Sequence, residues 1–466
     1  MPTVHWFRRD LRLCDNPALL AAVDQARAEG DGQVTPLFVI DPALWEPAGD
    51  VRRAALVASL ASLSDSLGGQ LLVRSGRPAT VVAEVARSVG AREVHVASDF
   101  APYGSARDTR VEAALAQVGA ELVRTGSPYA VAPGRVRKGD GTPYRVYTPF
   151  YRAWLAHGWR APALDCPNDV EWRSSPDSEL LPTSPELGAL VLPPAGEPAA
   201  LARWHAFRDA ALASYDERRD LPAVAGTSGL SAALKWGEIH PRTLLRDLAD
   251  QPDSEGVTVF RKEIAWREFY ADVLLHHPRS VSESLDPRFA AMQHDEGEVA
   301  DARFNAWCHG RTGYPFVDAG MRQLLAEGWM HNRVRMVVAS FLVKDLHLPW
   351  WRGAEWFMRW LRDGDVASNQ HGWQWAAGCG TDAAPYFRVF NPVSQGLRFD
   401  PAGDYVRAYI PELRHLPGRS AHEPWSAQGQ LGELTSGEEG YPARIVDHGV
   451  EREECLRRFA SLPRRT

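Results

Sequence analysis

The sequence of 466 residues contains only five cysteines, and no two of them form a Cys-x-x-Cys pair. This scarcity excludes a zinc ribbon and a disulfide framework, and it indicates a reducing compartment. No apolar run approaches the roughly 18 residues that a membrane-spanning helix needs. The first residues, MPTVHWFRRDLRL, lack the apolar core of a signal peptide. We therefore expect a cytoplasmic protein with no membrane-spanning segment and no metal site.

Phosphate-binding glycine motifs are also missing. Neither G-x-G-x-x-G nor a P-loop follows any predicted strand, so no motif supports a dinucleotide on the first half of the chain. The net charge is −7, and lysine is scarce, with only Lys138, Lys235, Lys262 and Lys344. An acidic total gives no general attraction to nucleic acid, so only a local basic patch, built mostly of arginine, could bind it.

Tryptophan, in contrast, is plentiful and unevenly distributed. Nine of the seventeen tryptophans lie between Trp266 and Trp375. Uniform core packing would not concentrate tryptophans in this way, so residues 266–375 are a candidate region for a functional site.

The predicted elements divide the chain into two unlike halves. Up to about residue 125, five short apolar strands alternate with amphipathic helices, which indicates a five-stranded parallel, doubly wound (Rossmann-like) sheet. Residues 161–200 are rich in proline and small residues, and from residue 201 the periodicity is helical. We expect an α/β domain over 1–128, a linker over 129–200 and an all-helical domain over 201–466.

The segment DGDVASNQHGWQW, residues 363–375, combines carboxylates, an amide and two indoles. If it is helical, Asn369 and Trp373 share a face at i,i+4, while Trp375 points elsewhere. The alternative is a buried helix with one satisfied polar residue.

The segment GWMHNRVRMVV carries a second pattern. Asn332 and Met336 share one face at i,i+4, as do His331 and Arg335. Together with Arg333, this face could contact phosphates, or it could be an ordinary solvated helix face.

Two weaker patterns precede it. In KEIAWREFY, Glu263, Trp266 and Arg267 are helix neighbours, which suits a base that is stacked and hydrogen-bonded on its edge. Taken alone, the same pattern is more often an ion pair beside a core tryptophan. The stretch from Tyr215 through TSGLS, residues 227–231, offers hydroxyls and backbone N–H groups to a phosphate, although plain helix capping explains it as well.

Taken in order along the chain, these patterns closely resemble the DNA photolyase/cryptochrome family. The resemblance runs through HWFRRDLRLCDNPAL, TSGLSAALKWGEIHPR, EIAWREFY, GRTGYPFVDAGMRQL, GWMHNRVRM and DGDVASNQHGWQWAAGCGTDAAPYFRVFNP, and it ends in YPARIVDH. Within the family the chain is most similar to cyclobutane pyrimidine dimer photolyases of the class I type.

The resemblance implies FAD in the helical domain, active as FADH⁻. Asp363 resembles the family's partner of Arg335 beside the flavin ring, and Asn369 matches the residue facing flavin N5. An amide there, where plant-type cryptochromes carry aspartate, indicates a repair enzyme. The implied cofactor contacts are Tyr215, Thr227, Ser228, Gly229, Leu230, Ser231, Phe260, Arg267, Arg335, Asp363, Asp365 and Asn369.

The resemblance also implies a substrate, UV-damaged DNA. Enzymes that act on the (6-4) photoproduct carry histidines where this chain has Asn332 and Met336, and splitting a cyclobutane dimer needs an electron but no net proton transfer. We therefore expect a deoxyribodipyrimidine photo-lyase, a carbon–carbon lyase, rather than the alternative, a blue-light-sensing cryptochrome without repair activity. The implied lesion contacts are Glu263, Trp266, Asn332, Arg333, Met336 and Trp375, and the implied catalytic residues are Asn369, Glu263, Trp373 and Trp351.

The chain departs from the family pattern in the electron relay. The family uses three tryptophans, of which Trp373 matches the inner and Trp351 the middle one. The segment MQHDEGEVADARFNAW, which should contain the outermost, has no tryptophan before Trp307. We expect slow photoreduction, or a substitute among Trp350, Trp356 and Trp360.

Two other positions leave alternatives open. Gly229 stands where relatives usually have arginine in TSRLS, so a nearby arginine could take over the grip on the FAD phosphates. The segment SDFAPYGSARD does not choose among a deazaflavin, a folate, a flavin or no antenna chromophore, which would lie in the α/β domain or its cleft with the helical domain. By resemblance we favour 8-hydroxy-deazaflavin over methenyltetrahydrofolate, and a monomer.

Overall fold

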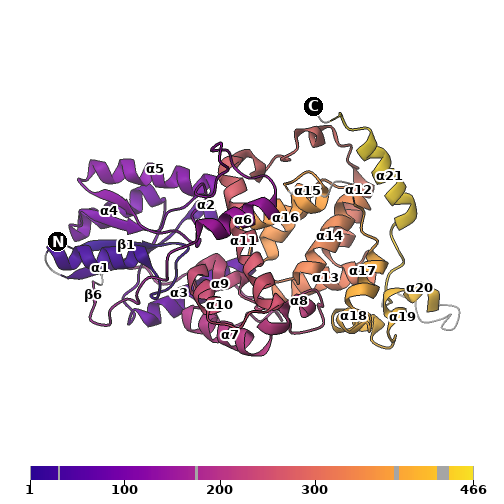
Figure 1. Ribbon diagram of the computed structural model, residues 1–466, viewed down its shortest axis with the longest axis horizontal. Coiled ribbons are helices and arrows are strands. Elements are labelled where there is room, and N and C mark those ends of the chain that lie inside the picture. The colour runs from indigo at the N-terminus through magenta and orange to yellow at the C-terminus, as the bar shows by residue number, and fades with distance from the viewer. Residues whose placement is uncertain (1, 30–31, 174–176, 382–387, 428–439, 465–466) are drawn as a thin grey trace.

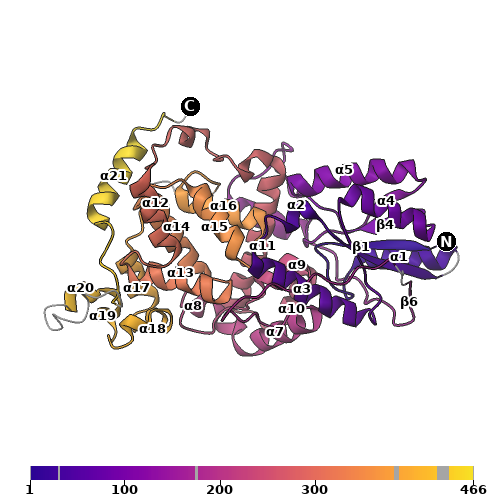
Figure 2. The same cartoon turned by 180° about the vertical axis from the view of Figure 1, so that it is seen from behind.

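The computed structural model describes residues 2–29, 32–173, 177–381, 388–427 and 440–464. An α/β domain and a larger helical domain lie side by side along the longest axis (Figure 1), and Figure 2 shows the same arrangement from behind. No helix within the described ranges is long and apolar enough to cross a membrane. The predicted two-part fold is confirmed.

The sheet contains all five predicted strands, and every pairing is parallel. Their order is β3-β2-β1-β4-β5, so the winding direction reverses between β1 and β4, and a crevice is expected at the carboxyl ends there. Helices α1 and α3 pack on one face, and α4 and α5 cover the other. The bounds are β1 Thr3–Phe7, β2 Gln33–Ile40, β3 Leu72–Ser75, β4 Glu93–Val96, β5 Glu121–Arg124, α1 Pro17–Glu29, α2 Pro42–Trp45, α3 Asp50–Ser66, α4 Pro78–Val89 and α5 Pro102–Gln117.

The linker contains more structure than its composition predicts. Residues Glu171–Trp172 form a two-residue strand, β6, which pairs with the start of β2. Residues Tyr147–His157 form helix α6, whose Trp154 is fully buried in the helical domain. Sequence periodicity missed both, because one is too short to show alternation and the other lies among prolines and glycines.

The start of the linker is fixed to a long helix of the helical domain, α11 (Glu255–His276). Glu268 accepts hydrogen bonds from the backbone N–H groups of Ala130 and Val131 and from the indole of Trp154, the last at 2.6 Å. One turn further on, Asp272 accepts from the backbone N–H of Gly134 at 2.6 Å. Burial raises the pKa of Glu268 to about 7.

The helical domain has two apolar cores. One gathers α6, α7, α10 and α11, and the other gathers α12 to α16 with the C-terminal helices. The bounds are α7 Glu197–Ala210, α8 Tyr215–Arg218, α9 Ser231–Trp236, α10 Pro241–Ala249, α12 Glu298–Cys308, α13 Pro315–Glu327, α14 Asn332–Lys344, α15 Trp350–Trp360, α16 Val366–Ala377, α17 Pro392–Phe399, α18 Asp404–Tyr409, α19 Arg419–His422, α20 Pro424–Ala427 and α21 His448–Ala460, with 3₁₀ turns at Leu212–Ser214, Pro278–Val281, Pro287–Ala291 and Pro411–Leu413.

Candidate functional site

Helix α16 carries the amide and the indole that the sequence placed on one face. Its N-cap is Asp365, whose Oδ1 accepts from the backbone N–H of Ser368 at 3.0 Å. Asn369 and Trp373 are both buried. The Asn369 amide donates to the carbonyl of Ala354 at 3.1 Å, and no donor among the described residues reaches its Oδ1. Asn369 Oδ1 is therefore available as an acceptor at the predicted flavin-facing position.

Immediately before α16, Asp363 pairs with Arg335 of α14. The Arg335 Nη2 to Asp363 Oδ2 distance is 2.8 Å, and the Asp363 side chain is only 2% exposed. The other carboxylate oxygen, Oδ1, is buried without a partner among the described residues. A buried unpaired carboxylate oxygen is costly, so this atom requires a donor from elsewhere.

Asp365 binds a residue that sequence reasoning missed. Arg9, just beyond β1 in the α/β domain, contacts Asp365 Oδ2 at 2.6 Å. Burial alone would raise the pKa of Asp365, but Arg9, Arg267 and Lys235 outweigh it and hold the pKa well below its usual range. The sequence feature that could have indicated Arg9 is the pair of adjacent arginines in HWFRRD, which comes directly after strand β1.

Both arginines near Asp365, Arg9 and Arg267, contact the same aromatic ring, that of Tyr129. The guanidinium of Arg267 is 4.6 Å from the ring centroid of Tyr129, and that of Arg9 is 5.9 Å from it. Arg267 also donates to the carbonyls of Pro128 and Leu234, at 2.9 and 3.0 Å. The predicted cofactor residue Arg267 thus links α11 to both the end of the α/β domain and α9.

A second charged cluster joins three helical segments. Glu263 pairs with Arg219 at 2.5 Å, Asp220 pairs with Arg333 at 2.7 Å, and Arg219 and Asp220 lie 3.9 Å apart. Burial raises the pKa of Glu263, and Arg219 partly offsets that shift. The structure thus brings the predicted residues Glu263 and Arg333 into one network through two residues of YDERRD that the sequence analysis did not single out.

The remaining predicted lesion contacts lie around this network. Arg333 Nη1 is 3.7 Å from the sulfur of Met336, and Asn332 is the exposed first residue of α14. Trp266 stacks on Tyr147 of α6, with ring centroids 3.7 Å apart and planes within 7°. Trp375 is half-buried against the second core.

The predicted phosphate-binding stretch lies between α8 and α9. Gly229 has φ +61°, a left-handed conformation that favours glycine. A side chain added there would meet Cδ of Arg203 at 3.4 Å, so an arginine from α7 lies where the family's own arginine would begin. Tyr215 meets Phe260 edge-on, with ring centroids 5.3 Å apart, and Phe260 is buried in the first core.

The relay candidates differ sharply in exposure. Trp373 is 2% exposed and lies 6.0 Å, centroid to centroid, from Trp307. Trp350 is also 2% exposed, whereas its neighbour Trp351 is 41% exposed, with their ring centroids 6.0 Å apart. The middle position that the resemblance implies for Trp351 therefore falls on an exposed ring, and Trp350, one of the predicted substitutes, is the buried one of the two.

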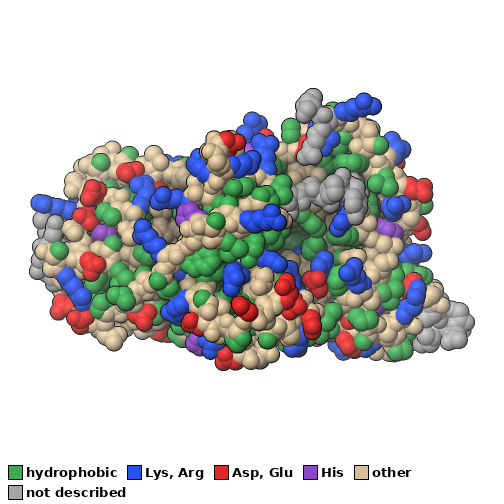
Figure 3. Space-filling view, in the orientation of Figure 1, with side chains coloured by type: hydrophobic (Ala, Val, Ile, Leu, Met, Phe, Trp, Pro, Cys, Tyr) green, Lys and Arg blue, Asp and Glu red, His purple; other side chains and the backbone are tan. Residues whose placement is uncertain are grey.

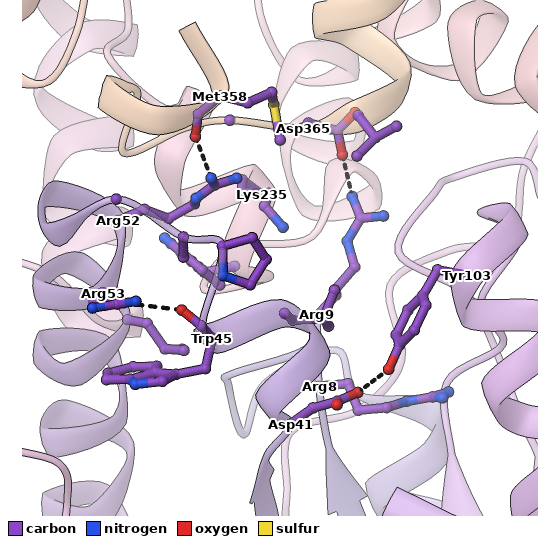
Figure 4. A pocket seen from close by; sticks show the side chains of 18 of the residues that line it. Arg8, Arg9, Asp41, Trp45, Arg52, Arg53, Tyr103, Lys235, Met358 and Asp365 are labelled. Atoms are coloured by element: carbon purple, nitrogen blue, oxygen red, sulfur yellow. Dashed lines mark hydrogen bonds and ion pairs between the residues drawn. The ribbon is translucent and has the colours of Figure 1, made fainter. Parts of the chain in front are cut away.

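A cavity of about 1090 Å³ separates the two domains (Figure 4). Its α/β wall includes the carboxyl ends of β1 and β2, helix α2 and the starts of α3 and α5, and its helical wall includes α9, α15 and the start of α16. This is the crevice that the strand order predicts. The labelled lining residues are Arg8, Arg9, Asp41, Trp45, Arg52, Arg53, Tyr103, Lys235, Met358 and Asp365.

Comparison with known proteins identifies the class. Residues 3–168 match the family model described as DNA photolyase, and residues 260–461 match the one described as FAD binding domain of DNA photolyase. The chain belongs to the DNA photolyase family.

Individual relatives extend the match over the whole length. The deoxyribodipyrimidine photo-lyase of Agrobacterium fabrum is 40% identical over 100% of this chain and 99% of its own. A bacterial class III photolyase from Agrobacterium tumefaciens superimposes with a TM-score of 0.90, at 38% identity over 99% of this chain and 97% of that one. An archaeal photolyase from Sulfolobus tokodaii, whose structure contains two FAD molecules, gives a TM-score of 0.83 at 27% identity, over 99% and 100% of the two chains.

Proposed function

We propose that the protein is a light-dependent deoxyribodipyrimidine photo-lyase that splits cyclobutane pyrimidine dimers in UV-damaged DNA with bound FAD. The observation that carries this proposal is the carboxylate oxygen Asp363 Oδ1, which is buried without a partner among the described residues and is held beside Arg335, six residues before Asn369, whose Oδ1 also accepts no hydrogen bond from a described residue. The N–H groups of a reduced flavin ring are donors of the kind these atoms require.

The residues present therefore fit FAD. Arg335, held by Asp363, would lie beside the ring, and Arg267 and Asp365 would line it further along. Tyr215, Phe260 and residues 227–231 would hold the remainder, with Arg203 replacing the arginine that Gly229 lacks. When bound, reduced and excited by light, the flavin supplies the electron that splits the dimer. Asn369, an amide rather than a carboxylate, adds no negative charge next to that donor.

The charged cluster would receive the lesion. Arg219 holds Glu263, and Asp220 holds Arg333, so both predicted lesion contacts are oriented before DNA arrives. Trp266 and Trp375 would supply apolar walls, and Asn332 and Met336 complete a pocket that has no histidine at the two proton-transferring positions. A flipped-out dimer can enter more cheaply than intact bases, because it already pairs poorly.

Basic side chains support DNA binding despite the acidic total. Figure 3 shows Lys and Arg side chains around a central patch of hydrophobic side chains on one face of the molecule. Such a rim would contact phosphates without regard to sequence, and binding should weaken with salt. We further propose that the protein acts as a cytoplasmic monomer, with functional units at 1–128, 129–200 and 201–466.

We assign the antenna chromophore to the cavity between the domains. Its aromatic lining, which includes Trp45, Tyr103 and Trp236, suits a flat ring system. By resemblance, 8-hydroxy-deazaflavin stays our preference over methenyltetrahydrofolate. A second flavin, as in the archaeal relative, is the closest competitor.

The test is repair of a dimer-containing oligonucleotide by the reduced protein, with and without blue light. Restored thymines should appear only under light. Glu263→Gln should lower the yield per absorbed photon several-fold, because it removes the charge that Arg219 holds. Glu255→Gln, on the same helix but 64% exposed, should leave the yield unchanged. Equal yields in light and darkness would disprove the proposal.

A further inference from the structure

Both amide hydrogens of Asn369 are used within the protein. Its Nδ2 donates to the carbonyl of Ala354 in α15 at 3.1 Å and to Oε1 of Gln370, the next residue of α16, at 2.8 Å. Adjacent side chains on a helix do not normally face each other, so this second contact requires one of the two side chains to turn back toward the other. An amide nitrogen carries only two hydrogens, and neither is left for a ligand.

Gln370 is itself held by the backbone of another segment. Its Nε2 donates at 2.6 Å to the carbonyl of Val281, the last residue of the 3₁₀ turn Pro278–Val281. One turn further along α16, the Nε2 of Gln374 donates to the carbonyl of Ser280 at 2.8 Å. The turn is therefore fixed to α16 by a second contact that does not involve Asn369 or Gln370.

A backbone carbonyl stands at each end of this chain of hydrogen bonds, and a carbonyl can only accept. If the Gln370 amide turned over, its oxygen would face the oxygen of Val281. If the Asn369 amide turned over, its oxygen would face the oxygens of Ala354 and Gln370. Each reversal would replace a hydrogen bond by a contact between two acceptors, which costs more than the loss of the bond alone. The two carbonyls thus fix the direction of both amides and leave Oδ1 of Asn369 for a ligand.

We propose that Gln370 is a positioning residue that holds Asn369 as a hydrogen-bond acceptor only, so that the site favours a flavin whose N5 carries a hydrogen. The inference rests on the proposed FAD site and deepens it. Reduction of the flavin ring to its anionic reduced form takes up two electrons and one proton, and the proton goes to N5. Oxidised N5 is an acceptor and would meet another acceptor, whereas reduced N5–H donates to Oδ1. An amide free to turn would serve both forms, but this one serves the reduced form.

The measurement is the ratio of reduced to oxidised FAD on the protein at a fixed ambient potential, set with a reference dye and read by absorbance in the dark without DNA. Gln370→Leu removes the acceptor and frees one Nδ2 hydrogen of Asn369, which oxidised N5 can then accept. The net effect of one hydrogen bond corresponds to a roughly two- to tenfold change in an equilibrium, so the ratio should fall by about that factor.

A conservative variant provides a rescue. Gln370→Glu keeps an oxygen for the Asn369 amide and, while its carboxyl group is protonated, an O–H donor for the Val281 carbonyl. Its ratio should equal that of the wild type at the same low pH and should fall below it once the carboxyl group ionises.

Two comparisons separate positioning from packing. In an Asn369→Ala background, adding Gln370→Leu should leave the ratio unchanged, because Gln370 acts only through the Asn369 amide. Gln374→Leu removes a hydrogen bond between the same helix and the same turn, and it should lower the urea midpoint but keep the wild-type ratio. Ser280→Ala, a milder change in that turn, replaces this control if Gln374→Leu loses FAD.

An unchanged ratio in Gln370→Leu, or an equally large fall in the Asn369→Ala background, would overturn the inference. If repair fails while Gln370→Leu lowers the ratio through Asn369, the proposed function is wrong and this inference stands. If repair is normal and the ratio does not change, only the inference is wrong.

Discussion

The contact between Arg9 and Asp365 gives a quantitative prediction about how the two domains are joined. The side chains are 19% and 12% exposed, and their N–O distance is 2.6 Å. Removing one partner of a buried ion pair costs about 3–5 kcal/mol, because the other charge stays buried. Arg267, Lys235 and the N–H of Ser368 continue to stabilise Asp365, so we expect Arg9→Met to lose about 3 kcal/mol, the lower end of that range.

The same contact fixes the direction of the pH dependence. The pKa of Asp365 is depressed in the folded protein, so its contribution to stability is complete above the ordinary Asp pKa of about 3.9 and is lost as the pH falls below it. In Arg9→Met the depression is smaller. The difference in stability between wild type and variant should therefore be largest near neutral pH and should shrink below about pH 4.

Urea unfolding followed by tryptophan fluorescence and circular dichroism measures both effects. In the double variant Arg9→Met/Asp365→Asn, the loss should be smaller than the sum of the two single losses, because no unpaired charge remains. Arg27→Met removes an exposed pair with Asp169, at 2.7 Å, and should have no measurable effect. Simple additivity in the double variant, or wild-type stability of Arg9→Met, would refute the argument.

Three further predictions follow from burial and packing. Trp350→Phe and Trp351→Phe should each slow the photoreduction of oxidised flavin, measured by transient absorption, while repair by the pre-reduced protein persists. Unchanged photoreduction rates in both variants, together with slow photoreduction in Trp356→Phe, would place the electron relay at Trp356 instead. Gly353→Ala would put a methyl 2.1 Å from Cη2 of Trp373 and should cost about 1–3 kcal/mol in denaturant unfolding, whereas Gly372→Ala, with nothing within 4 Å, should not be destabilising. Burial lowers the pKa to about 4 for four histidines, His95, His240, His331 and His371. The unfolded chain therefore binds more protons than the folded protein between about pH 6.5 and 4, and the urea midpoint of unfolding should fall as the pH drops through that range. A constant midpoint would contradict this.

Local patterns predicted the features that depend on local spacing. Strand and helix periodicity gave the five strands, and the i,i+4 relation placed Asn369 and Trp373 on one buried face of α16. The partner of Asp365 lies 356 residues away in the sequence, and no local pattern identifies such a contact. The difference in exposure between Trp350 and Trp351 was equally inaccessible, because adjacent tryptophans look alike in sequence and only packing buries one and exposes the other.

The linker's attachment to α11 has a consequence for how ligands reach the cavity. Glu268 binds residues 130–131 and Trp154 at once, and Asp272 binds Gly134, so the chain leaving the α/β domain is already part of the helical domain's interior. A tether would let the domains sample many orientations, whereas this attachment sets one orientation as the helical domain folds. The cavity is then complete before any chromophore arrives, and binding should proceed at a rate independent of domain closure.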